Sequence, residues 1–127
     1  MNNKLPSEQL SDFLNFVSVA QTRCRICREE METQDKLTQD YLHSLELGDL
    51  DRSERSKLAT KLSINRKDRR YYKDRVEEFE PIVEFFKDPN HKKTLDQLTQ
   101  ILGKLRKAED YHKNRTYKPK VLREELK

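Results

Sequence analysis

The chain has 127 residues, of which 39% are charged and 33% are apolar, with two glycines, four prolines and no tryptophan. This composition favours a single all-α domain whose long helices each bury a narrow apolar stripe. The sequence has no run of about 18 apolar residues, which excludes a membrane-spanning helix, and no signal-peptide core near its start, so we expect a cytoplasmic protein. The net charge of +4 is too small to indicate a nucleic-acid-binding protein by itself.

The first predicted helix spans residues 7–47, with Ser7 as its N-cap and Gly48 as its stop. Its seam follows steps of three and four, as in a coiled coil. The members of this seam are Leu10, Phe13, Val17, Ala20, Cys24, Cys27, Met31, Gln34, Thr38, Tyr41 and Leu45. Cys24 and Cys27 share this apolar face and no second ligand pair exists, so we expect reduced, buried thiols rather than a zinc or redox site.

A second helix is predicted over residues 51–87, with Asp51 as its N-cap and a kink near Pro81. Its seam contains both apolar and polar residues. These are Leu58, Leu62, Asn65, Arg69, Tyr72, Val76, Phe79, Val83 and Phe86. The polar members interrupt the middle of an otherwise apolar stripe.

A third, shorter helix is predicted over residues 94–112, starting at Thr94. Gly103 lies inside it, and since glycine weakens a helix, we interpret this position as a close approach of a neighbouring element. Residues 113–127 are expected to form a C-terminal arm.

The short connection after Gly48 predicts an antiparallel helical hairpin, in which facing residues have numbers that add to about 99. Gln34 then lies opposite Asn65, and Cys24 opposite Val76. The third helix covers only part of so long a hairpin. We therefore expect a homo-oligomeric bundle, at least a dimer.

The polar band in the middle of the seam has two interpretations. In the structural one, it fixes the register of the helices, and Arg69 reaches solvent or pairs with Glu30 or Asp35. In the functional one, basic residues on one side of the second helix form a pocket for phosphate groups. Those basic residues are Arg66, Arg69, Arg70 and Lys73. Residues expected to stack on a base, contact its edges or close the pocket are Tyr72 or Tyr71, Asn65, Gln34, Asn114, Arg115 and Tyr117.

Catalysis has little support in this sequence. No glycine-rich phosphate loop and no nucleophile motif is present. Asp40 with His43, and Glu109 with His112, have the i, i+3 spacing of metal-binding bundles, but the first pair lies off the seam and further ligands are lacking. We therefore expect no catalytic residue, no metal site and no cofactor.

The stretches LSINRKDRRYYKDRVEEFEPIVEFF and NRTYKPKVL resemble small all-helical proteins encoded by phages and integrated elements of Gram-positive bacteria. The resemblance covers roughly the second half of the chain and implies a role in manipulating a bacterial host, in the cytoplasm of an infected or lysogenic cell. The leading hypothesis is a non-enzymatic binder that sequesters a small phosphorylated, nucleotide-type ligand, as a counter-defence sponge for a host signal does. The alternative is a module that binds nucleic acid or a host protein, such as a nuclease, through its basic helix face.

Overall fold

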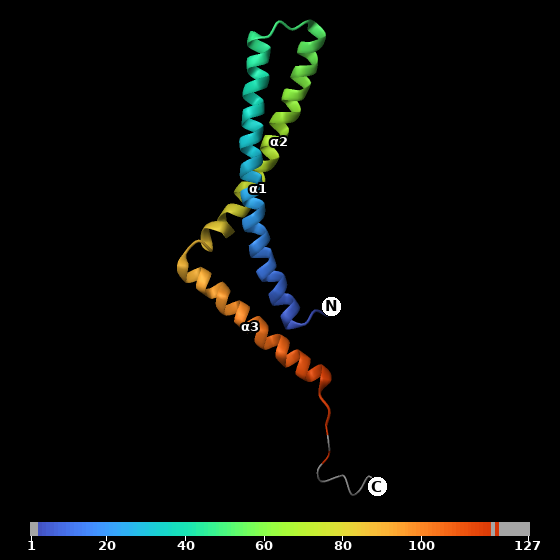
Figure 1. The fold of residues 1–127 in the computed structure, drawn as a ribbon, viewed down its shortest axis with the longest axis vertical. Coiled ribbons are helices and arrows are strands. Elements are labelled where there is room, and N and C mark those ends of the chain that lie inside the picture. Colours follow the sequence, from blue (N-terminus) through green and yellow to red (C-terminus); the bar gives the residue numbers. More distant parts are fainter. Residues whose placement is uncertain (1–2, 118, 120–127) are drawn as a thin grey trace.

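The computed structural model describes residues 3–117 and 119 (Figure 1). Three helices and no strand make up this part of the chain: α1 spans Pro6–Leu47, α2 spans Arg52–Phe85 and α3 spans Pro89–Asn114. The prediction of an all-α protein is confirmed.

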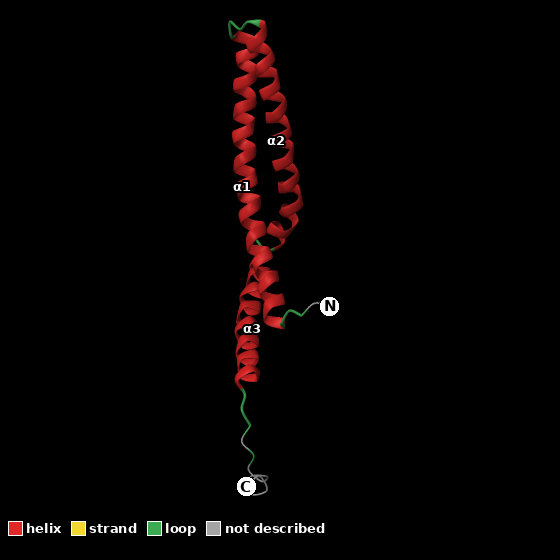
Figure 2. Ribbon diagram, turned by 90° about the vertical axis from the view of Figure 1, so that its right-hand side faces the viewer, coloured by secondary structure: helices red, strands yellow, loops and turns green. Residues whose placement is uncertain are grey.

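Helices α1 and α2 form a long antiparallel hairpin, and the two views agree on its elongated outline (Figures 1 and 2). The last turns of α2 swing away from α1, and α3 then runs back to meet the beginning of α1 (Figure 1). The first half of α1 therefore has neighbours on two sides, α2 along the seam and α3 near its start.

The predicted N-cap of α1, Ser7, is wrong. The N-cap residue is Leu5, whose side chain forms no capping bond, and Pro6 occupies the first helical position. The backbone N–H of Ser7 instead donates to Oε1 of Glu109 on α3, over 3.0 Å. A carboxylate from another helix thus satisfies one of the free N–H groups of the first turn and complements the positive end of the helix dipole.

The connection between α1 and α2 follows its predicted chemistry. Gly48 follows the last residue of α1, and its N–H bonds to the Ser44 carbonyl. A Cβ atom at position 48 would lie 2.5 Å from that carbonyl oxygen, which explains the glycine. Asp51 accepts a hydrogen bond from the Glu54 N–H at 2.7 Å, so the predicted cap of α2 is confirmed.

Helix α2 continues through Pro81 as a single helix that ends at Phe85. Two expectations about α3 need correction. Helix α3 begins at Pro89 rather than at residue 94, because Asp88 caps the Asn90 N–H at 2.8 Å and proline suits the first helical position. Nothing lies within 4 Å of a Cβ built on Gly103, so that glycine marks no close approach.

The core of the hairpin is a small apolar cluster formed by Cys24, Cys27 and Val76. Both cysteines are free and buried, as predicted. The partly buried side chains of Met31, Tyr72, Phe79 and Val83 pack against this cluster. The contact of Cys24 and Cys27 with Val76 agrees with the predicted antiparallel register.

Candidate functional site

The basic residues of α2 form a shallow hollow of about 410 Å³ on the surface of the hairpin. Five of its six lining residues are cationic, and none is acidic. The hollow is lined by Ser63, Arg66, Lys67, Arg69, Arg70 and Lys73. We call these five cations and Ser63 the basic face. It unites the four residues predicted to hold phosphate groups and adds Lys67, which the sequence analysis missed although it stands four residues from Ser63 and three from Arg70.

Arg69 lies at the boundary between the basic face and the seam. Its Nε donates to Oδ1 of Asp35 on α1 at 2.5 Å, and its side chain is about one quarter exposed. Of the two partners considered for this arginine, the structure thus selects Asp35. The ion pair fixes the position of the guanidinium group across the two helices.

The other four cations of the basic face are exposed, and within the described residues none of them forms an ion pair. Four positive charges on adjacent turns of one helix repel each other, and an anion bound between them relieves this repulsion. Arginine is suited to this task because its planar fork of N–H donors matches two oxygens of a phosphate group.

Asn65 and Gln34 do not reach the basic face, because they bond to each other inside the hairpin. Nδ2 of Asn65 donates to the Gln34 backbone oxygen at 2.9 Å and to its Oε1 at 2.7 Å. The Thr38 hydroxyl donates to Oδ1 of Asn65 at 2.6 Å. Asn65 is only 3% exposed. These three residues form what we call the polar layer, which supports the structural interpretation of the polar band: it fixes the register of α1 against α2.

Tyr72 belongs to the core and does not line the hollow. Its ring packs against the cluster of Cys24, Cys27 and Val76, and burial raises the pKa of its hydroxyl above its ordinary value. Tyr71 contacts Tyr72 edge-to-face, with ring centroids 5.4 Å apart, and Arg75 lies over the Tyr71 ring at 5.0 Å. Neither tyrosine lines the hollow, so the expected stacking platform is not assembled beside the arginines.

The predicted contribution of the C-terminal arm is also not assembled within one chain. Asn114 is the last residue of α3, and Arg115 and Tyr117 follow it as exposed residues. The end of α3 lies towards the end of the molecule opposite to the hairpin connection, far from the middle of α2 (Figure 1).

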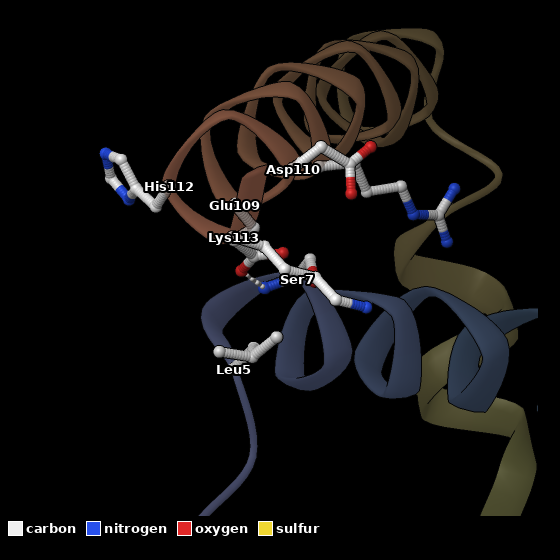
Figure 3. Close-up of a pocket in the computed structure, with 7 residues that line it drawn as sticks. Leu5, Ser7, Glu109, Asp110, His112 and Lys113 are labelled. Atoms are coloured by element: carbon white, nitrogen blue, oxygen red, sulfur yellow. Dashed lines mark hydrogen bonds between the residues drawn. The ribbon is translucent and has the colours of Figure 1, made fainter. Parts of the chain in front are cut away.

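A second hollow, of about 680 Å³, lies where α3 meets the start of α1 (Figure 3). Glu109 points towards Ser7, whereas His112 turns outwards (Figure 3). The i, i+3 pair of Glu109 and His112 therefore does not converge on a common point. Among the described residues there is no group of three or more histidine, cysteine or acidic side chains placed to hold a metal ion.

No family model, curated protein or solved structure matches this chain. None of the helices in the described part of the chain combines the length and the apolar character needed to cross a membrane.

Proposed function

We propose that this protein is a non-enzymatic binding module that holds a small phosphorylated, nucleotide-type ligand on the basic face of α2 and acts as a homo-oligomer. The observation that supports this proposal is the hollow of about 410 Å³, lined by five cations and no acid. Charge-assisted hydrogen bonds from arginine to phosphate are about twice as strong as neutral ones.

The dimensions of the basic face suit a ligand with more than one phosphate group. Arg66 and Lys73 are one heptad apart, which is about 10 Å along a helix that rises 1.5 Å per residue. Arg69, held by Asp35, provides a fixed charge at one edge of the hollow. Because no aromatic side chain lines the hollow, phosphate groups rather than the base supply most of the binding free energy in this proposal.

In this role binding itself is the activity. A ligand held on the basic face is withdrawn from its receptor, which is what a sponge for a host signal does. The resemblance to phage-encoded proteins implies a host-manipulating role, and sequestering a host signal is one such role.

Isothermal titration calorimetry with ATP and with a cyclic dinucleotide tests the proposal. The double variant Arg66→Ala/Arg70→Ala should bind at least about tenfold more weakly, since each charge-assisted hydrogen bond contributes roughly 1.5–3 kcal/mol. Arg52→Ala is the matched control, because it removes an exposed arginine of the same helix outside the hollow. Equal affinity of wild type and double variant, or no binding of either probe by the wild type, would refute the assignment.

Arg69→Ala addresses the ion-paired arginine separately. It should abolish ligand binding and leave the oligomer intact, because the guanidinium anchors one edge of the hollow. Unchanged affinity would remove Arg69 from the site.

The alternative is binding to the backbone of a nucleic acid, and one observation favours it: all residues of the basic face come from a single helix, so the hollow is open along its length. Backbone binding releases counterions and weakens steeply with added salt, whereas a compact bidentate contact weakens less. Titration of a single-stranded oligonucleotide and of ATP over a series of salt concentrations separates the two. A protein partner, such as a host nuclease, would leave both titrations without signal.

A further inference from the structure

Helix α1 and the N-cap residue before it carry a second set of apolar side chains that is separate from the seam. Leu5, Phe16, Val19 and Ile26 are all between 42% and 49% exposed. They belong to one line of residues that follows steps of four and three along the helix. This line, which we call the outer stripe, consists of Leu5, Gln9, Asp12, Phe16, Val19, Arg23, Ile26 and Glu30.

The middle of the outer stripe, from Phe16 to Ile26, faces neither α2 nor α3. The seam of α1 is marked by the buried residues Val17, Ala20 and Cys24, and at 3.6 residues per turn the outer stripe lies about 100° around the helix from it. Ser7, where α3 docks, lies on the other side of the seam. The middle of the outer stripe therefore lies on a third side of α1, which no helix in the described part of the chain covers.

The charges of the outer stripe are complementary to those of a second copy of α1 that runs antiparallel to it. Asp12 lies four residues before Phe16, and Arg23 lies four residues after Val19. An antiparallel copy centred between Phe16 and Val19 therefore brings each Phe16 against a Val19 and each Asp12 against an Arg23. A parallel copy would place like charges opposite each other, which is unfavourable.

These charges are available for a contact between chains. Within the described part of the chain Arg23 forms no ion pair. Asp12 pairs with Lys4, but both side chains are more than half exposed. Such surface pairs contribute little to stability, so exchanging this partner for another costs little.

The accessible surface of the chain is also large enough for part of it to be buried in an interface. Its accessible area is 10607 Å², whereas a compact monomer of 15.3 kDa exposes about 7,000 Å². The difference exceeds the roughly 800 Å² that each partner buries in a standard stable interface.

We infer that the outer stripe is the surface through which the protein self-associates, with a second copy of this chain packed antiparallel on it about a twofold axis between Phe16 and Val19. The two copies then bury two Phe16–Val19 layers flanked by two Asp12–Arg23 pairs. Such a self-complementary contact closes after two chains and gives a dimer. This inference rests on the self-association that we proposed above and is independent of the ligand.

Sedimentation velocity of the full chain, over a hundredfold range of concentration, tests the inference. Wild type should be a dimer and Phe16→Asp a monomer. Asp12→Arg should weaken the dimer at least tenfold, and the exchange Asp12→Arg/Arg23→Asp should restore it. Asp40→Arg is the matched control, because it reverses an exposed charge on α1 outside the outer stripe. Far-UV circular dichroism of each variant shows that α1 is still folded.

A monomeric wild type, or a dimer unaffected by Phe16→Asp, would overturn the inference. A dimer that Asp12→Arg weakens and the exchange does not restore would overturn the antiparallel arrangement. The ligand proposal fails in a different measurement: Arg66→Ala/Arg70→Ala protein should sediment as a dimer whether or not it binds phosphate.

Discussion

Replacing Asn65 by alanine should destabilise the hairpin more than any other substitution of an uncharged polar residue on α2. The change removes three hydrogen bonds inside the polar layer, two donated to Gln34 and one accepted from Thr38. Each contributes about 1 kcal/mol net when both partners are buried. In the variant the Thr38 hydroxyl turns its single proton to the Gln34 carbonyl oxygen, which lies 2.9 Å away, and this offsets part of the loss. We therefore expect a cost of about 2–3 kcal/mol.

The assay is urea unfolding followed by far-UV circular dichroism. It uses one fixed protomer concentration, because the proposed self-association would add to the apparent stability. Thr38→Val removes one of the three bonds and should cost about 1 kcal/mol. Gln39→Ala is the matched control on α1, since Gln39 is exposed, and it should change the free energy of unfolding by less than about 0.5 kcal/mol.

A triple variant separates the hydrogen bonds from the packing. Gln34→Leu/Thr38→Val/Asn65→Leu replaces the whole polar layer by apolar side chains, and such replacements are often neutral or stabilising because no buried polar group is left unpaired. The triple variant should therefore be at least as stable as wild type. If Asn65→Ala lowers the free energy of unfolding by less than about 0.5 kcal/mol, water replaces the lost hydrogen bonds and the polar layer does not stabilise the hairpin.

Three further substitutions probe other parts of the fold by urea unfolding. Gly103→Ala should stabilise the protein by about 0.5–1 kcal/mol, because glycine weakens a helix interior and the added Cβ meets nothing; a lower midpoint would contradict this. Burial raises the pKa of Tyr72, so the folded protein holds this proton more tightly than the unfolded chain. Stability is then complete below the unfolded pKa of about 10 and is lost as the pH rises through the folded value, and Tyr72→Phe should reduce that alkaline loss; an equal loss in the variant would refute it. Glu109→Ala should cost about 1–2 kcal/mol and speed hydrogen exchange of the Ser7 amide, whereas unchanged exchange would show that the carboxylate does not cap α1.

The antiparallel hairpin and its register were predictable because their signals are local. The alternation of three and four steps defines one face on each helix, and the glycine at position 48 fixes where the chain turns. Those two facts place Gln34 opposite Asn65, and the hydrogen bonds between them confirm it. The basic face was predictable for the same reason, since residues three and four apart share a side of any helix.

The cap of α1 was not predictable because its donor and acceptor are 102 residues apart. Sequence rules for helix termini look only at the first turn, where Ser7 is the obvious candidate, and a carboxylate arriving from α3 leaves no signal there. The outer stripe is a different case. Its steps of four and three are visible in the sequence beside those of the seam. The seam alone explains why the segment is helical, so the apolar residues of the outer stripe resemble isolated surface residues.

Tyr72 does not line the basic face because it occupies a seam position. Tyr72 stands four residues before Val76 in the seam, and the same register that places it there directs its ring into the core, away from the basic face. Arg69 also stands in the seam, three residues before Tyr72, yet its outcome differs, because its long side chain carries the charge out to Asp35 at the edge of the helix pair. A tyrosine ring is too short and too apolar to leave the seam in this way. A seam position can therefore supply a charged group to the neighbouring surface, but not an aromatic platform, and any ring that stacks on a ligand of the basic face has to come from outside the seam.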